Sequence, residues 1–314
     1  MKKILKPIVR TIVETPLRSV ENRLLAQYGK NPVWPHIFIT GAPRSGTSLF
    51  YEALVTRFYF SYITNLADRF PRTPAAVSWL FSSAQANRIS KYSSDYGTIP
   101  GLFAPNEAGG LWNLWNAHGD WNDETFLPEL PVDRMRKTLT AISTITGNPF
   151  VNKNVMHANR IRMLDAVFPG CLFIEVRRNP REVARSIIRA QPEEKSPQPQ
   201  SDGWWSVRPL NATGTHPVEQ AVRQIEGVTA DIARDTEALI RPCLYTVEYE
   251  SFCAAPEVEM YKVAEFLSTH GVEIAVRSKI PDAFELRPST PLLAKDEERL
   301  DESMCRTRTG ADTP

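Results

Sequence analysis

The sequence predicts an α/β domain of three layers, in which helices cover both faces of a central parallel sheet. Short apolar and β-branched runs recur along the 314 residues, and segments with helical periodicity separate them. Strands that alternate with helices in this way are typical of parallel sheets with crossover connections. A glycine-containing loop also lies between the first strand and the helix after it, an arrangement that suits anion binding.

Each element follows from a local pattern. The predicted strands cover 36–40, 150–153, 171–176 and 244–249, and helical patterns lie near 157–168, 181–190, 217–240 and 256–269. After the loop at 41–46, a helical stripe is formed by Leu49, Phe50, Leu54 and Phe58. We therefore assign 31–300 to one domain and expect a flexible polar tail at 301–314.

The overall composition excludes several classes of function. The net charge of +1 predicts no nucleic-acid partner, so any anion site must be local. The four cysteines have no C-x-x-C spacing, so we expect neither a zinc site nor a disulfide framework, and a reducing, cytoplasmic location fits best. No apolar run is long enough for a transmembrane helix.

The first 30 residues form a separate amphipathic helical segment. Apolar residues fall on one helical face, and Lys2, Lys3, Lys6 and Arg10 lie elsewhere on the helix. One interpretation is peripheral contact with the inner surface of a membrane. The other, which we favour because Pro7 and Pro16 interrupt the pattern, is packing on the same domain or on a partner chain.

The loop Gly41–Ser48 nearly matches the P-loop pattern G-x-x-x-x-G-K-[ST]. Its backbone N–H groups and the following helix would form an anion site. A P-loop NTPase needs lysine where Thr47 stands, and here the cation is Arg44, inside the loop. The loop therefore suits one phosphate group and its substituent better than a triphosphate with its metal ion.

Three segments together resemble the sulfotransferase family. Pro43-Arg-Ser-Gly-Thr-Ser48 is similar to its 5′-phosphosulfate loop, and Arg178-Asn-Pro…Ser186 is similar to its 3′-phosphate motif. Leu244-Tyr-Thr-Val-Glu-Tyr-Glu250, followed by Pro256 and Phe266-Leu267, resembles a third family segment. The resemblance implies a P-loop NTPase-like fold and transfer of a sulfuryl group from 3′-phosphoadenosine 5′-phosphosulfate (PAPS), with no metal expected.

The resemblance also assigns roles to individual residues. The donor-binding residues it implies are Arg44, Ser45, Gly46, Thr47, Ser48, Arg178, Ser186 and Tyr249. Arg44 and Lys153 would also assist catalysis beside the leaving phosphate. Tyr249 would lie near the adenine, although a core-facing tyrosine fits its strand equally well. Lys153 is followed by Asn154 and Val155, so the histidine that serves as base in some members is missing.

The general base is left open among three residues. Glu107 is the first choice, because Pro105-Asn-Glu107 resembles a P-x-E segment of many bacterial members. His118 and His157 are the alternatives, although a lone histidine is more often structural. Asp68 and Arg69 are weaker candidates for acceptor contacts.

The acceptor cannot be identified from the sequence. A hydroxyl or amine of a carbohydrate, glycolipid or other small molecule is expected, and the loop at 191–216, with its paired tryptophans, is predicted on the acceptor side. The competing functions are a P-loop kinase or NTPase and a binding module without activity. The oligomeric state is left open.

Overall fold

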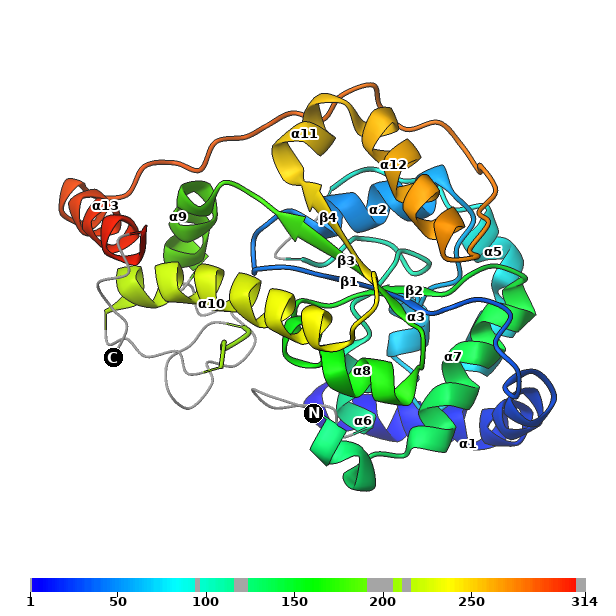
Figure 1. The fold of residues 1–314 in the computed structure, drawn as a ribbon. Coiled ribbons are helices and arrows are strands. Elements are labelled where there is room, and N and C mark those ends of the chain that lie inside the picture. The colour runs from blue at the N-terminus through cyan, green and yellow to red at the C-terminus, as the bar shows by residue number, and fades with distance from the viewer. Residues whose placement is uncertain (1, 94–96, 116–123, 191–205, 211–215, 309–314) are drawn as a thin grey trace.

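The computed structural model describes residues 2–93, 97–115, 124–190, 206–210 and 216–308, with side chains of the first helix from Glu14 onward. Four parallel strands form one sheet in the order β2-β1-β3-β4 (Figure 1). Their bounds are β1 (Ile37–Thr40), β2 (Val151–Lys153), β3 (Leu172–Arg177) and β4 (Leu244–Glu248). Each bound lies within one residue of the predicted strand, so the predicted sheet is confirmed.

Helices cover both faces of this sheet. In Figure 1, α2 (Thr47–Arg57), α11 (Tyr249–Ala254) and α12 (Pro256–Thr269) lie above it, and α8 (Ile161–Val167) and α10 (Pro217–Ala238) lie below. Residues Ile37–Ile39 of β1 are fully buried, as expected for a parallel strand covered on both faces. The three-layer α/β fold is therefore confirmed.

The strand register brings three loops to one edge of the sheet. Ile39 pairs with Lys153 at the end of β2, and Thr40 pairs with Glu175 of β3. After β2 the chain forms a 3-10 helix, η2 (Val155–Asn159), where the pattern near 157–168 predicted the start of a single helix. After β3 it enters α9 (Pro180–Ala190). This carboxyl edge is where ligands bind in open α/β sheets.

A long connection between β1 and β2 forms several helices that the sequence analysis left unassigned. They are α3 (Asn65–Asp68), α4 (Pro74–Leu80), α5 (Ser82–Ala86), α6 (Gly109–Leu114), η1 (Glu124–Glu129) and α7 (Val132–Thr146). The segment that contains Glu107 lies directly before α6 and reaches the carboxyl edge of the sheet.

The N-terminal helix α1 (Lys2–Tyr28) falls within the predicted helical segment and runs without interruption past Pro7 and Pro16. Packing explains its continuity from Glu14 onward. The Glu21 carboxylate accepts hydrogen bonds from the N–H groups of Ala75 and Ala76, at the start of α4. Burial raises the pKa of Glu21 to about 7. This part of α1 therefore packs on its own domain, and membrane contact by residues 2–13 stays a prediction.

The C-terminal helix α13 (Ala294–Arg308) corrects the predicted flexible tail over 301–308. Leu300 is fully buried, and Glu297 accepts two hydrogen bonds from the Arg185 guanidinium on α9. These contacts stabilise the helix although its sequence is polar. Residues 309–314 lie outside the described chain, as does most of the predicted acceptor-side loop. Among the described helices, none is both long and apolar enough to cross a membrane.

Candidate active site at the carboxyl edge of the sheet

The loop after β1 turns sharply into α2. Arg44 and Gly46 both adopt left-handed backbone conformations, with φ values of 67° and 92°. The Tyr249 ring packs directly on Gly46: a Cβ at this position would lie 2.2 Å from the ring. Gly46 is therefore required twice, for its backbone angle and for the close approach of an aromatic ring. The two left-handed residues and the Tyr249 contact therefore fix the turn from β1 into α2.

Two predicted donor-binding residues meet although they are far apart in the sequence. The Arg44 Nε–H donates a 2.9 Å hydrogen bond to the Ser186 hydroxyl of α9. This contact joins the loop after β1 to the helix after β3. Ser186 is half-buried, and its hydroxyl is held against the loop by this bond.

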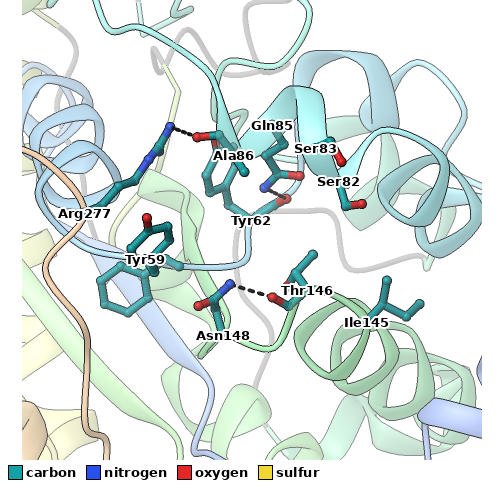
Figure 2. Close-up of a pocket in the computed structure, with 11 residues that line it drawn as sticks. Tyr59, Tyr62, Ser82, Ser83, Gln85, Ala86, Ile145, Thr146, Asn148 and Arg277 are labelled. Atoms are coloured by element: carbon teal, nitrogen blue, oxygen red, sulfur yellow. Dashed lines mark hydrogen bonds between the residues drawn. The ribbon is translucent and has the colours of Figure 1, made fainter.

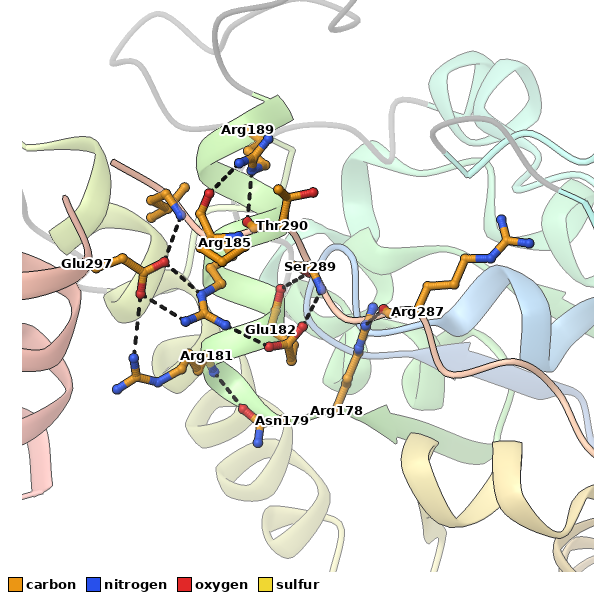
Figure 3. Close-up of polar contacts among 12 residues, drawn as sticks. Arg178, Asn179, Arg181, Glu182, Arg185, Arg189, Arg287, Ser289, Thr290 and Glu297 are labelled. Atoms are coloured by element: carbon orange, nitrogen blue, oxygen red, sulfur yellow. Dashed lines mark hydrogen bonds and ion pairs between the residues drawn. The ribbon is translucent and has the colours of Figure 1, made fainter. Parts of the chain in front are cut away.

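Arg178 lies two residues before the start of α9, against Tyr249. Its guanidinium carbon is 5.0 Å from the Tyr249 ring centroid, within the range of a cation–π contact. One of its terminal nitrogens donates to the Arg287 carbonyl oxygen at 3.0 Å. Arg287 begins a segment, residues 287–291, that crosses α9 and is called the strap below (Figure 3). The Arg178 Nε is buried with no partner among the described residues. Arg178 thus has hydrogen-bonding capacity to spare for an anion.

Lys153 joins the phosphate loop to the candidate base. Its ammonium donates to the Ser48 hydroxyl at 3.1 Å and forms a close ion pair with the Glu107 carboxylate. The Lys153 side chain is only 3% exposed, whereas Glu107 is 34% exposed. The sequence analysis placed these residues in separate roles, and the structure brings them into direct contact at the end of β2.

Asn154 is a site residue that sequence reasoning missed. Its side-chain N–H donates to the Glu107 carbonyl oxygen at 3.1 Å, and its side-chain oxygen caps η2 by accepting from the Met156 N–H. The residue after Lys153, which departs from the family's usual motif, therefore fixes the backbone that carries Glu107. The departure from that motif at Asn154 was the feature of the sequence that could have identified this residue.

Gly97 lies against the cluster formed by Ser48, Lys153 and Glu107. Its carbonyl oxygen accepts a 3.4 Å hydrogen bond from the Ser48 hydroxyl. A Cβ at Gly97 would lie 2.9 Å from the Glu107 carboxylate oxygen. With φ at 88°, this residue suits glycine alone. Nothing in the sequence pattern singled it out.

His157 does not fit the role of base. It is fully buried, and desolvation together with Arg160 and Lys153 holds its pKa well below the ordinary value. Its Nε2 lies 3.0 Å from the Asn152 side-chain oxygen, within the core beneath the sheet. A base must reach the acceptor, so the structure argues against His157. His118 lies outside the described residues.

Asp68 is also structural. Its carboxylate accepts hydrogen bonds from the N–H groups of Gly110 and Leu111, at the start of α6. An acidic group near a helix N-terminus stabilises that helix. Asp68 therefore positions the helix that follows Glu107, and its predicted contact with an acceptor is not supported.

A separate pocket of about 280 Å³ lies beside the chain that precedes β2 (Figure 2). Tyr59, Tyr62 and Arg277 are among the residues that line it. Ser61 in this region pairs with the residues before β2, whereas Lys153 ends that strand. The pocket is therefore remote from the carboxyl edge and plays no part in the arrangement around Lys153.

Replacing Gly46 with alanine should destabilise the protein more than the same change at Gly170. Gly170 has a similar φ of 82°, but a Cβ there would meet nothing within 4 Å. Both variants carry the strain of a left-handed alanine, about 1–2 kcal/mol. Only Gly46→Ala must also displace the Tyr249 ring, which adds about 1–3 kcal/mol. Thermal unfolding should show a lower Tm for Gly46→Ala, and equal Tm values would contradict this packing.

The site combines two cationic regions and a carboxylate. Arg44 and Arg178 flank α9, and Lys153 lies between the phosphate loop and Glu107. Such an arrangement can bind a doubly phosphorylated anion and remove a proton from a group beside Glu107. Within the described part of the chain, no group of His, Cys, Asp or Glu side chains is placed to hold a metal ion.

Comparison with known proteins agrees with the three-layer α/β fold. The fold is similar to that of the sulfotransferase STF1 from Mycobacterium tuberculosis H37Rv, with a TM-score of 0.50, 16% identity, and coverage of 91% of this chain and 81% of that one. Sulfotransferase STF9 from Mycobacterium avium gives a TM-score of 0.50 at 15% identity, covering 88% of this chain and 69% of that one. No curated protein matches in sequence.

The sequence model of the sulfotransferase family matches residues 35–272. This range contains the phosphate loop, Glu107, Lys153, Arg178 and Tyr249. It covers well over half of the chain and includes every strand of the sheet. The chain therefore belongs to the sulfotransferase family.

Proposed function

We propose that this protein transfers the sulfuryl group of PAPS to a hydroxyl or amine of an acceptor, with Glu107 as general base. The observation that carries the proposal is the placement of the Lys153 ammonium between Ser48 of the phosphate loop and the Glu107 carboxylate. One cation thereby contacts both the region assigned to the donor and the group assigned to the acceptor.

The residues at the carboxyl edge fit such a donor. The Ser45 hydroxyl and the Arg178 Nε are both buried without a hydrogen-bond partner among the described residues. Buried polar groups are costly unless they are paired, so each is suited to an oxygen of a bound anion. We assign the loop at Arg44–Ser48 to the 5′-phosphosulfate and Arg178 with Ser186 to the 3′-phosphate. Tyr249 is assigned to the adenine side.

PAPS supplies an activated sulfuryl group when it is bound. In the proposed in-line transfer, the acceptor oxygen or nitrogen forms a bond to sulfur as the bond from sulfur to the phosphate oxygen breaks. Glu107 takes the proton that the acceptor loses. Lys153 and Arg44 stabilise the negative charge that develops on the departing phosphate.

We further propose a carbohydrate or glycolipid as the acceptor, and a cytoplasmic location that includes the inner membrane surface. The resemblance to bacterial family members supports the acceptor class. The basic residues near the N-terminus of α1, Lys2, Lys3, Lys6 and Arg10, support contact with anionic lipids.

Titration calorimetry tests the identity of the donor. The protein should bind PAP, the 3′,5′-bisphosphate product, without magnesium, and Arg178→Ala should weaken this binding by about tenfold or more. Arg306→Ala is the matched control, because Arg306 lies on α13 and is exposed. Tight binding of ATP with magnesium and none of PAP would overturn the proposal, as would an unchanged affinity in Arg178→Ala.

A further inference from the structure

The chain from Gly97 to Glu107 forms a loop whose two ends meet at the ion pair of Lys153 and Glu107. A Cβ on Gly97 would lie 2.9 Å from a Glu107 carboxylate oxygen and 3.9 Å from the Lys153 ammonium. The loop therefore leaves this point at Gly97 and returns to it at Glu107. The contacts that hold the loop in shape decide where the Glu107 carboxylate lies.

The residues that begin α3 form the frame around which this loop is wound. The Asn65 N–H donates to the Ala104 carbonyl oxygen at 3.0 Å, and the Asn106 N–H donates to the Ile63 carbonyl oxygen at 2.9 Å. Both bonds join the second half of the loop to the backbone at the start of α3. This half of the loop is therefore fixed to a helix that lies outside it.

The Asn65 side chain holds the loop at three points. Its Nδ2 donates to the carbonyl oxygens of Ile99 and Gly101, each at 2.7 Å. Its Oδ1 accepts a 2.6 Å hydrogen bond from the Asn106 side-chain amide. Both N–H donors and the oxygen of the Asn65 amide are thus engaged. One side chain contacts the part of the loop next to Gly97 and the residue directly before Glu107.

A backbone group fixes the orientation of both amides. The Ala108 N–H can only donate, and it lies 2.6 Å from the Asn106 Oδ1. The NH2 group of Asn106 therefore faces Asn65, which presents its oxygen. The NH2 group of Asn65 then faces two carbonyl oxygens, which can only accept. The contacts at position 65 consequently require an amide, and a carboxylate of the same shape cannot make them.

Contacts from β2 hold Glu107 on the other side. The Asn154 side chain donates to the Glu107 carbonyl oxygen at 3.1 Å, and the Asn152 side chain donates to the Asn106 carbonyl oxygen at 3.2 Å. The backbone at Glu107 thus lies between Asn65 and the end of β2. Loss of the Asn65 amide removes the contacts on the loop side and leaves those from β2 in place.

We propose that Asn65 is a positioning residue for sulfuryl transfer. It acts through Asn106 and Ile99, and it sets the Glu107 carboxylate relative to Lys153 and the acceptor. A displacement of about 1 Å at a reacting group can cost about a hundredfold in rate. This inference rests on the proposed role of Glu107 as general base, and it names the residue that orients that base.

Asn65→Asp tests the inference, because it preserves the shape of the side chain and replaces the two N–H donors by an oxygen. The single-turnover rate of sulfation should fall by about tenfold to a hundredfold. Affinity for PAP should stay within about twofold, since Asn65 is assigned no contact with the donor. Asn65→Ala should lower the rate in the same way without adding a charge. Asn113→Asp, at an exposed asparagine of α6, is the matched control and should keep the wild-type rate.

Hydrogen–deuterium exchange tests the contacts without any need for turnover. In Asn65→Asp, amides of the peptide that covers 97–107 should exchange about tenfold faster or more, because the loop opens more often. The peptide that covers α7 should be unchanged. Unchanged exchange over 97–107 would overturn the inference, and so would faster exchange with a wild-type rate of sulfation.

A double-mutant cycle separates positioning of Glu107 from general support of the site. In the Glu107→Gln background no carboxylate is left to orient, so Asn65→Asp should lower the rate by no more than about twofold further. A further tenfold loss in that background would overturn the inference. A near-normal rate in Glu107→Gln alone would instead reject the proposed base, and the exchange measurement would still decide whether Asn65 holds the loop.

Discussion

Replacement of Lys153 by methionine should lower the single-turnover rate of sulfation by about a hundredfold to a thousandfold. Methionine preserves the length of the side chain and removes its charge. The buried ammonium of Lys153 contacts both Ser48 and Glu107, so no nearby group can replace it at the same position. The measurement is a rapid-quench assay with saturating labelled PAPS and an excess of acceptor.

The matched control is Lys137→Met. The Lys137 side chain is 38% exposed and pairs with Asp133 on α7, far from the loop after β1 in sequence, so its loss should leave the rate within about twofold. The Tm of Lys153→Met should remain close to that of the wild type, because Glu107 is partly exposed and can be solvated once its partner is gone. A single-turnover rate within threefold of the wild type would remove Lys153 from the mechanism.

Glu107→Gln should reduce the single-turnover rate by roughly a hundredfold to ten-thousandfold, the contribution expected of a general base. The amide preserves the shape of the side chain and keeps an oxygen that can accept from Lys153, but it cannot take up a proton. Affinity for PAP should change little, since we propose that Glu107 contacts the acceptor and not the donor. The same rapid-quench assay, which measures the sulfated acceptor formed in one turnover, gives the rate directly.

Chemical rescue distinguishes a general base from a residue that only supports the structure of the site. In Glu107→Ala, added formate should restore part of the rate if a carboxylate is needed as a base, and chloride should not. Glu129→Gln, at an exposed glutamate of η1, is the matched control. A near-normal rate in Glu107→Gln, or no rescue of Glu107→Ala by formate, would return the choice of base to His118.

The strands and the phosphate loop were predictable because their signals are local. Apolar runs define buried strands, and the loop glycines define a turn, so both are encoded within a few residues. The contact of Lys153 with Glu107 spans 46 residues and depends on the path of the chain between β1 and β2. No periodicity encodes that path, because it consists of short helices held by individual polar contacts.

Burial explains the other differences between prediction and structure. His157 looked like a possible base because histidine often is one, but its position beneath β1 and Trp112 removes it from solvent. Residues 301–308 looked flexible because they are polar, yet Leu300 anchors them. In both cases the residue types alone suggested one role or state, and burial in the folded chain produced another.

The strap that meets Arg178 has a consequence for protein engineering. The family match ends at residue 272, whereas the strap and α13 follow it. The strap contacts α9 through Ser289, which donates two hydrogen bonds to Glu182, and α13 contacts α9 through Glu297. A chimera joined at the family boundary would combine one member's Arg178 equivalent, which we propose binds the 3′-phosphate, with another member's strap. When donor-site segments are exchanged between relatives, the C-terminal residues should therefore be exchanged with them. The strap and α13 then come from the same protein as the α9 that they contact.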